Sequence, residues 1–401
     1  MAVVETLLLI YFSIPVFYTL VFALAGNMRR QNSYAEKANA DSSEDKVNKI
    51  AVFVPAYKED AIICHTASKL LASNYPKDRF DVVVIADSLK AETLESLSEL
   101  DIKLFKVDFE KSTKTKSLNY AFSRLNDHYD IAIICDADNI FIPDFLSKIN
   151  LTYNKGYQAI QGQRIAKNLN TSYAILDAAS EMINNHIFRK GANAVGISSS
   201  VIGSGMAFNY DMIKDILSQV EAVGGFDKVM QLQLIEKGHK IHYLPDALAF
   251  DEKIENQDAF KKQRRRWLSS QFIYLKKFFP KGIKMLLKGN LDYFIIAVFY
   301  SLFPPRLLLL GMLFILTVIS IIFGVAPLVW AGLTATYMLS MAISLPAKFY
   351  NKRLLIAVLS IPKAFLNMVL IMFKLKGADK QFIHTTHTKV EVDNSLFKHE
   401  N

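Results

Sequence analysis

Two long stretches without charge constrain this 401-residue chain more than any other feature. Leu7 to Ala25 contains no charged residue, and neither does Leu307 to Ala347. Because about 20 consecutive apolar residues make a membrane-spanning helix, the first stretch predicts one span and the second predicts two. Roughly residues 45 to 265 have the composition of a water-soluble protein. We therefore expect a soluble domain between membrane helices.

The formal net charge of +9 lies largely beside the apolar stretches. Arg29 and Arg30 follow the first one, and no basic residue precedes it, which favours a retained anchor over a cleaved signal peptide. Basic flanks mark the cytosolic face and its anionic lipids. Cys64 and Cys135 show no zinc spacing, in keeping with a reduced compartment. We expect a multi-pass protein of the cell (inner or plasma) membrane with a cytosolic domain, membrane lipids as partners and no nucleic acid.

Four strands are predicted in the soluble part, with helical patterns between them. The strands cover residues 49–55, 81–88, 102–107 and 131–135. Alternating strands and helices, such as the one expected at Lys116 to Leu125, indicate a parallel α/β sheet. Ligands of such sheets bind beyond the carboxyl ends of the strands. The acidic residues that follow these ends are Glu59, Asp87, Asp136 and Asp138.

The second half of the chain reads as helices at or in a membrane. An amphipathic surface helix is expected at 260–290, a short apolar helix at 293–303, and a helical hairpin at 307–323 and 328–345. Pro362 interrupts residues 354–373, which favours an interfacial or re-entrant helix. The predicted parts are an anchor (1–30), a linker (31–47), a catalytic domain (48–259), interfacial helices (260–305), a transmembrane hairpin (306–347), an interfacial or re-entrant helix (348–376) and a C-terminal tail (377–401).

The triplet Asp136-Ala137-Asp138 is the main candidate for a metal site. Two carboxylates on a turn after a strand can hold Mg²⁺ or Mn²⁺ together with diphosphate oxygens, because these ions prefer hard oxygen ligands. The triplet alone is common in proteins. Its place after the apolar strand favours a metal site over a solvated turn.

Several other polar residues allow two interpretations each. Asp87 and the pair Glu59-Asp60 either cap a helix or hydrogen-bond a nucleotide. Lys114 and Lys116 either face phosphate or uracil, or open a solvated helix.

The glycine-rich stretch Gly203-Ser204-Gly205-Met206 either brings backbone close to a ligand or forms a plain turn. Asp227, where a loop meets a predicted helix, is either the helix N-cap or a general base.

Gln263-Arg264-Arg265-Arg266-Trp267 is the most specific string in the sequence. Gln263 and Trp267 share one helix face. Trp267 offers a flat wall to a sugar ring and arginine can bind diphosphate, although a basic membrane-surface patch would look similar. Near the C-terminus, residues 382–389 (FIHTTHTK) suit a loop that touches a ligand or a surface tail. His384 and His387 alone make a poor zinc site.

Taken together, these strings resemble the membrane-integrated family 2 glycosyltransferases, which include cellulose, chitin and hyaluronan synthases. VPAYKED, IAD, CDAD and QRRRW occur in the family's order over residues 48–275. The resemblance implies an α/β GT-A (nucleotide-diphospho-sugar transferase) domain with flanking transmembrane and interfacial helices. It also implies a UDP-sugar donor, Mg²⁺ or Mn²⁺, and inversion at the anomeric carbon.

The resemblance also gives the candidate residues roles. Asp227 matches the family's catalytic base, although Phe226 stands where an acidic residue is usual, and 382–389 looks like the family's gating loop, with Thr388 and Lys389 on the nucleotide. The metal residues are Asp136 and Asp138. The nucleotide- and donor-binding candidates are Glu59, Asp87, Lys116, Asp136, Arg266 and Lys389. The acceptor-binding candidates are Gln263, Trp267, Gly203, Ser204 and Gly205.

The expected function is an inverting hexosyltransferase that extends a polysaccharide or glycan at the cytosolic membrane face. Three predicted spans are few for a polymer channel, so a homo-oligomer or a polysaccharide-export partner is one expectation. A single transfer to a polyprenyl- or other lipid-linked acceptor is the alternative. Phe226 leaves a catalytically inactive scaffold open. A transporter or channel is disfavoured by the few charges within the spans.

Overall fold

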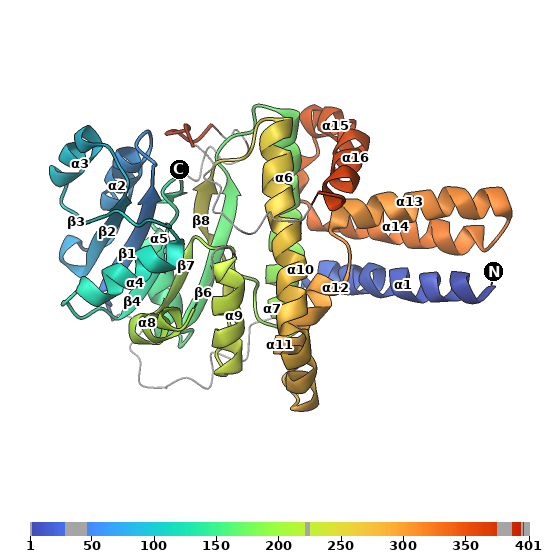
Figure 1. Ribbon diagram of the computed structural model, residues 1–401, viewed down its shortest axis with the longest axis horizontal. Coiled ribbons are helices and arrows are strands. Elements are labelled where there is room, and N and C mark those ends of the chain that lie inside the picture. Colours follow the sequence, from blue (N-terminus) through green and yellow to red (C-terminus); the bar gives the residue numbers. More distant parts are fainter. Residues whose placement is uncertain (1, 29–45, 221–224, 375–386, 394–395, 397–401) are drawn as a thin grey trace. The chain divides into compact units, whose positions relative to one another are not determined.

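The computed structural model describes residues 2–28, 46–220, 225–374, 387–393 and 396, and these fall into two compact units. The sheet unit contains the described residues of 31–169, 198–253 and 379–401, and the helical unit contains those of 1–30, 170–197 and 254–378. Residues 170–197, which lie inside the predicted catalytic domain, belong to the helical unit. The tail after residue 386 belongs to the sheet unit (Figure 1).

The sheet unit is built on an eight-stranded sheet with the order β3-β2-β1-β4-β7-β6-β8-β5. Its strands are β1 (Ile50–Tyr57), β2 (Phe80–Asp87), β3 (Lys103–Val107), β4 (Ile131–Ile134), β5 (Ile140–Phe141), β6 (Ala159–Ala166), β7 (Met206–Asn209) and β8 (His242–Asp251). β1 to β4 pair in parallel, as predicted.

Beyond β4 the sheet is mixed: β6 and β8 pair in parallel, but the prediction of a parallel sheet is wrong for the other pairs. β7 pairs antiparallel with both β4 and β6, and β5 pairs antiparallel with β8. β5 and β7 are only two and four residues long. β8 contains Pro245 and shifts its register against β6. Strands this short or irregular leave little periodic signal in a sequence.

β1 also continues past Pro55, where the sequence predicted its end. The Phe53 carbonyl accepts a hydrogen bond from the Cys135 backbone N–H, so it points toward β4. Pro55, two residues on, faces the same side, but pairing with β4 stops at Phe53. The proline therefore removes no ladder hydrogen bond, and β1 stays paired with β2 up to Tyr57.

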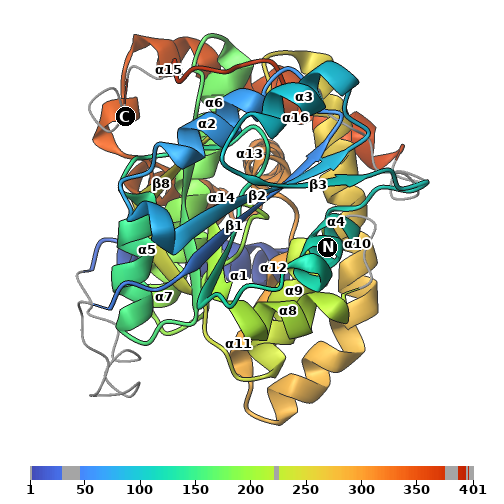
Figure 2. The ribbon, with the colours of Figure 1, turned by 90° about the vertical axis from the view of Figure 1, so that its left-hand side faces the viewer.

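Helices cover the sheet. They are α2 (Ile63–Leu71), the short η2 (Lys77–Arg79), α3 (Ala91–Ser98), α4 (Lys114–Arg124), α5 (Phe145–Asn154), α8 (Tyr210–Ser218) and α9 (Phe226–Glu236). α2 packs on β2, and α4 packs on β1 and β2 (Figure 2). Phe53, Phe122 and Tyr210 form an aromatic core between them, with the first two rings 4.3 Å apart. α4 begins at Lys114, two residues before the helix expected at Lys116 to Leu125.

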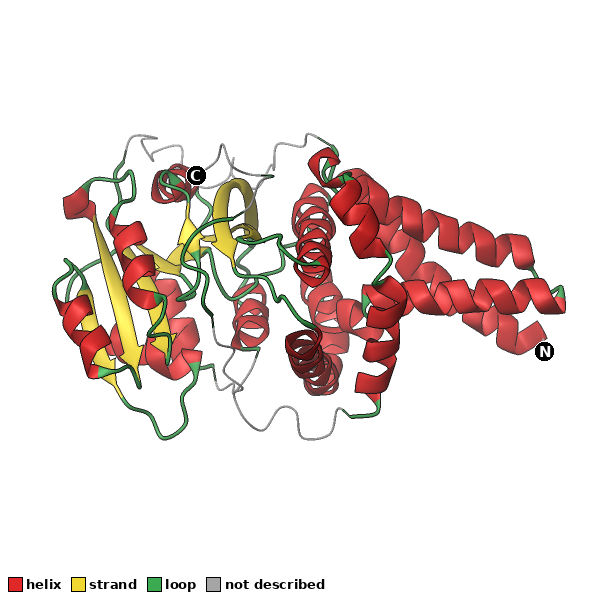
Figure 3. Cartoon of the chain, turned by 90° about the horizontal axis from the view of Figure 1, so that it is seen from above, coloured by secondary structure: helices red, strands yellow, loops and turns green. Residues whose placement is uncertain are grey.

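The helical unit contains the predicted membrane helices (Figure 3). Its elements are α1 (Ala2–Ala25), α6 (Ser172–Asn184), η3 (Asn185–Gly191), α7 (Ala192–Ala194), α10 (Gln257–Leu287), α11 (Leu291–Phe294), η4 (Ile295–Phe299), α12 (Tyr300–Leu302), α13 (Arg306–Phe323), α14 (Pro327–Ser344), η5 (Ala347–Phe349), α15 (Lys352–Val358) and α16 (Ile361–Met372). Within the described ranges, α1, α13 and α14 are long and apolar enough to cross a membrane. They pack together through Phe12, Val16, Leu313 and Trp330.

The expected interruption in residues 354–373 is confirmed. α15 and α16 are apolar helices that meet at a bend of 42°. The break precedes Pro362, which occupies the first turn of α16, where a missing N–H is tolerated. The bent pair suits a broken span or a re-entrant loop.

Candidate functional site

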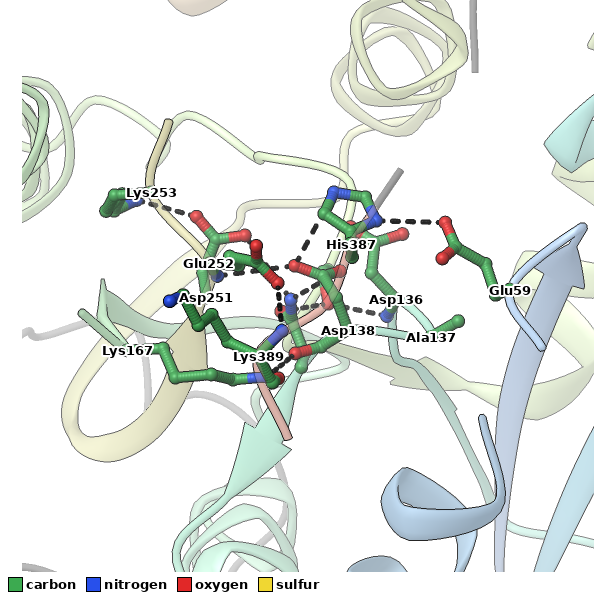
Figure 4. A network of polar contacts seen from close by, with 12 residues as sticks. Glu59, Asp136, Ala137, Asp138, Lys167, Asp251, Glu252, Lys253, His387 and Lys389 are labelled. Carbon is green, nitrogen blue, oxygen red and sulfur yellow. Dashed lines mark hydrogen bonds and ion pairs between the residues drawn. The ribbon is translucent and has the colours of Figure 1, made fainter. Parts of the chain in front are cut away.

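Asp136 and Asp138 lie on the turn that leaves the buried strand β4 (Figure 4). The Asp136 carboxylate pairs with Lys114, and its backbone N–H donates to the Ser204 hydroxyl over 2.8 Å. Asp138 is buried and accepts hydrogen bonds from the Asn139 side chain at 3.1 Å and the Glu252 backbone N–H at 3.3 Å. The turn is thus a packed element of the sheet edge, not the solvated turn that was the alternative.

Burial raises the pKa of the Asp138 carboxyl, because a buried carboxylate loses its hydration. The neighbouring His387 opposes this effect, and the nearby acids Asp251 and Asp136 add to it. A cluster of acids in a buried place stabilises a positive charge brought to it.

The C-terminal tail lies against this turn. His387 Nδ1 is 2.9 Å from Glu59 Oε1, and its Nε2 is 4.0 Å from Asp138 Oδ2 (Figure 4). The backbone N–H groups of Thr388 and Lys389 both donate to Glu252 Oε2, at 3.0 and 2.9 Å. The structure thus brings Glu59 and Lys389 to the Asp138 turn, while His384 lies outside the described residues.

Burial by itself would lower the pKa of His387, but the carboxylates around it outweigh burial. Asp138, Glu59 and Glu252 together raise this pKa to about 10. The imidazole is therefore protonated at neutral pH and supplies a positive charge beside Asp138.

Lys167, which the sequence reading missed, links the tail to the turn. Its amine is buried and donates to the Asp138 carbonyl and, over 3.0 Å, to the Lys389 carbonyl. Glu252 was missed as well. Both follow the ends of strands, β6 and β8, so recognition of those strands would have drawn attention to them.

Of the two interpretations given to the acids near the ends of β1 and β2, the first suits Asp60 and the second suits Asp87. Asp60 Oδ1 accepts from the Lys90 backbone N–H at 2.8 Å and the Thr93 hydroxyl at 2.7 Å, so it holds the start of α3. Asp87 is buried, and its Oδ1 accepts from the Ser88 hydroxyl at 3.0 Å. Among the described residues, Asp87 Oδ2 has no hydrogen-bond partner. A buried carboxylate oxygen without a partner suits a ligand that donates to it.

Of the two lysines that open α4, Lys114 reaches the site. Its amine contacts Asp136 and donates to the Gly203 carbonyl over 2.6 Å. The exposed Lys116 instead donates to the nearby Lys111 carbonyl over 2.9 Å. The solvated helix start therefore describes Lys116 in this structure, and nucleotide contact by Lys116 stays a prediction.

The glycine-rich loop packs against the aspartate turn. The buried Ser204 hydroxyl accepts from Asp136 N–H and donates to Asn139 Oδ1 over 2.7 Å. Gly203 and Gly205 have φ angles of +84° and +61°, which favour glycine. Ser204 thus fixes the turn, and acceptor contact by this loop stays a prediction.

Asp227 is the second residue of α9, whose N-cap is the left-handed Gly225, so the interpretation of Asp227 as N-cap is wrong. Its Oδ1 accepts from the Lys228 backbone N–H at 2.9 Å. Burial raises the pKa of Asp227, and the hydrogen bond from Lys228 and the charge of Lys114 oppose this. A raised pKa brings a carboxylate closer to what a general base needs.

Gln263, Arg266 and Trp267 lie in α10 of the helical unit. Trp267 is 41% exposed, and the Arg264 guanidinium lies 4.5 Å from the centre of its ring. Arg264 also pairs with Asp177 of α6. Contact of Gln263, Arg266 and Trp267 with a sugar donor or an acceptor stays a prediction.

The side chains at the aspartate turn supply only some of the ligands that a divalent metal ion needs. In the described portion of the chain, no group of three or more His, Cys, Asp or Glu side chains is arranged to hold a metal ion. Asp136 and Asp138 supply hard oxygen ligands of the kind that Mg²⁺ and Mn²⁺ prefer. The residues therefore fit a metal whose remaining ligands come from a diphosphate.

Comparison with known proteins identifies a family to which much of this chain is similar. The sequence profile described as "Glycosyltransferase like family 2" matches residues 48–270. The probable glycosyltransferase YdaM of Bacillus subtilis is 23% identical over 283 residues, which is 64% of this chain. The chain spans 63% of the length of that relative.

Two solved structures show a distant likeness. A mannosyltransferase from Pyrobaculum calidifontis, in complex with GDP-Man and Mn²⁺, is 16% identical, with 84% of this chain and 96% of that one covered and a TM-score of 0.49. TarS residues 1–349 of S. aureus, in complex with UDP-GlcNAc, are 13% identical, with 84% and 93% covered and a TM-score of 0.40.

Proposed function

Since this chain belongs to the glycosyltransferase-like family 2, we propose that it is an inverting glycosyltransferase that moves a sugar from a UDP-sugar to a growing polysaccharide or glycan. The family match and the mixed α/β sheet agree with the GT-A-like fold expected for the sheet unit. The finer subtype, that of the cellulose, chitin and hyaluronan synthases, is part of the proposal.

The observation that carries the proposal is the aspartate turn at the carboxyl edge of β4. Asp136 and Asp138 offer oxygen ligands there, and the sheet order puts β1 between β4 and β2. Asp87 ends β2 with a buried carboxylate oxygen that has no partner among the described residues. A nucleotide diphosphate supplies what both features lack, a hydrogen-bond donor for Asp87 and additional oxygens for a metal.

Asp136 and Asp138 would hold Mg²⁺ or Mn²⁺, which when bound neutralises charge on the departing diphosphate. Asp87 would hydrogen-bond the nucleotide, and Lys114 would offer its ammonium to phosphate. Asp227 would accept the proton of the acceptor hydroxyl while that oxygen bonds to the anomeric carbon. The bond from that carbon to the UDP oxygen breaks on the opposite face, so the configuration inverts.

For the acceptor, a single transfer to a polyprenyl- or other lipid-linked molecule is the second candidate. The observation behind it is that only three helices, or four with the bent pair, are apolar enough to span in the described ranges. Product length separates the two: a ladder of products indicates a polysaccharide, and one added sugar indicates a lipid-linked acceptor. In both cases we propose a multi-pass membrane protein with the sheet unit in the cytosol.

The proposed activity is tested by UDP release from a panel of UDP-sugars, with and without Mn²⁺. We expect release from at least one donor, dependent on the metal and stimulated by a membrane extract that carries acceptors. A GDP-sugar arm tests the nucleotide. Absence of release from every donor, by a protein that is folded by circular dichroism, would favour the inactive scaffold.

A further inference from the structure

The ammonium group of Lys114 has three partners, which come from three segments of the sheet unit. It pairs with the Asp136 carboxylate, donates to the Gly203 carbonyl over 2.6 Å, and lies 5.3 Å from the centre of the Phe226 ring. A lysine ammonium has three N–H donors. Two of these N–H groups can bind the oxygens of Asp136 and Gly203, and the third can face the Phe226 ring.

The Phe226 ring is a fixed part of this arrangement. Phe226 opens α9, immediately before Asp227, and its side chain is buried. A Cβ built on Gly203 would lie 3.9 Å from both the Phe226 ring and Asp227 Oδ2. The ring, the Gly203 backbone and the carboxylate of Asp227 therefore lie close together, next to the Lys114 ammonium.

The side chain at position 226 determines the net charge around the Lys114 ammonium. A carboxylate there would form an ion pair with Lys114 and cancel its charge. It would also disfavour ionisation of Asp227 through like-charge repulsion. An aromatic ring attracts a cation through its quadrupole and carries no net charge. With Phe226, Asp136 is the carboxylate that pairs with Lys114 among the described residues.

We propose that Phe226 is a positioning residue whose ring holds the Lys114 ammonium for the diphosphate of the donor. When the Asp136 carboxylate binds the divalent metal ion, the Phe226 ring and the Gly203 carbonyl keep the Lys114 ammonium in place. The remaining N–H of the ammonium then binds a phosphate oxygen. Phe226 thus acts through Lys114 and touches neither the donor nor the reacting atoms. This role rests on the proposed function, because it requires a nucleotide diphosphate at the site.

The test is calorimetric titration of UDP, in the presence of Mn²⁺, into the full chain in detergent micelles. Phe226→Leu removes the ring, and we expect about three- to tenfold weaker binding, the size of a partly desolvated cation–π contact. Phe226→Tyr keeps the ring face and should bind within about twofold of the wild type. The double variant Phe226→Leu/Lys114→Met should bind as weakly as Lys114→Met alone, because the ring acts only through the ammonium.

Two results would overturn the role of Phe226: wild-type affinity in Phe226→Leu, or losses that simply add in the double variant. Circular dichroism controls for folding, and Phe226→Met replaces the leucine variant if the latter does not fold. A folded wild type that binds neither UDP nor GDP would contradict the proposed function and this inference together. A wild type that binds UDP, beside an equally tight Phe226→Leu, contradicts this inference alone.

Discussion

At the scale of single residues, Asp60 and Asp87 show how alike two acids can look in a sequence and how differently they act. Asp60 follows β1 and Asp87 ends β2, two strands that pair in parallel. Asp60 accepts hydrogen bonds from the Lys90 backbone N–H and the Thr93 hydroxyl at the start of α3. Asp87 is buried with one oxygen that has no partner among the described residues. The first acid is satisfied within the protein, and we propose that the second binds the nucleotide.

We expect Asp87→Asn to weaken UDP binding about tenfold or more, since hydrogen bonds to charged groups are worth more than neutral ones. Asp60→Asn is the matched control, because an asparagine oxygen can still accept from Lys90 and Thr93. Its affinity for UDP should stay within about twofold of the wild type. Titration of UDP into both variants checks this, and equal losses in the two would refute the assignment of Asp87.

Asp227 is the residue on which the chemical step depends. We expect Asp227→Asn to lower transfer by about 10² to 10⁴, the range for loss of a general base. UDP binding should remain intact, because the amide keeps the shape of the side chain. Turnover and UDP affinity are measured side by side on the same preparation. Normal turnover by Asp227→Asn would remove Asp227 from the role of base.

At the scale of elements, the tail from His387 to Asp393 is held mainly by charge. His387 contacts Glu59 and Asp138, and Glu252 accepts from the backbone of the two residues that follow. The tail thus docks on acids that also surround the candidate metal site. Its docking and the occupation of that site are expected to influence each other.

The tail should detach as the pH rises. The pKa of His387 increases from an ordinary 6.5 to about 10 when it is docked. A group with a raised pKa in the docked state stabilises docking fully below the ordinary value, and the effect is lost as the pH rises through the docked value. Protection of residues 387–393 from hydrogen exchange, corrected for the intrinsic rate, should therefore fall between about pH 6.5 and 10. His387→Gln should abolish this pH dependence; the same fall in that variant would contradict it.

The apolar helices allow a matched test of packing in the helical unit. A Cβ added at Gly311 of α13 would lie 2.2 Å from the Phe365 ring of α16, whereas one added at Gly332 of α14 meets no atom of the described residues within 4 Å. Alanine favours a helix over glycine by about 0.5–1 kcal/mol, and overpacking costs about 1–3 kcal/mol. Gly332→Ala should melt at or above the wild-type temperature in detergent, and Gly311→Ala below it. The reverse order would show that α13 and α16 do not pack as described.

At the scale of the whole molecule, the pattern of apolar residues predicted the long and regular helices and strands. The apolar stretches gave α1, α13 and α14. The strands β1, β2 and β4 were found with their acids because each is a mostly buried run, and the partly exposed β3 was found as well. The second half of the sheet was missed, since β5 and β7 are short and β8 carries a proline. Lys167 and Glu252 follow β6 and β8, which were not predicted, and they were missed for that reason.

Long-range contacts could not be predicted from local pattern at all. The sheet unit gathers residues 46–169, 198–253 and the tail, with segments of the helical unit between them in the sequence. The approach of His387 to Glu59 joins residues 328 positions apart. The choice between Asp60 and Asp87 as the cap of α3 likewise depends on which loop reaches the helix.

The central claim, that Asp136 and Asp138 hold a divalent ion for a nucleotide diphosphate, is tested most directly by calorimetry. UDP is titrated into the wild type and into Asp138→Asn, with Mn²⁺ present and after its removal by a chelator. We predict that Mn²⁺ tightens UDP binding by about tenfold or more in the wild type and by less than twofold in Asp138→Asn. Metal enhancement of equal size in both proteins, or none in the wild type, would contradict the account.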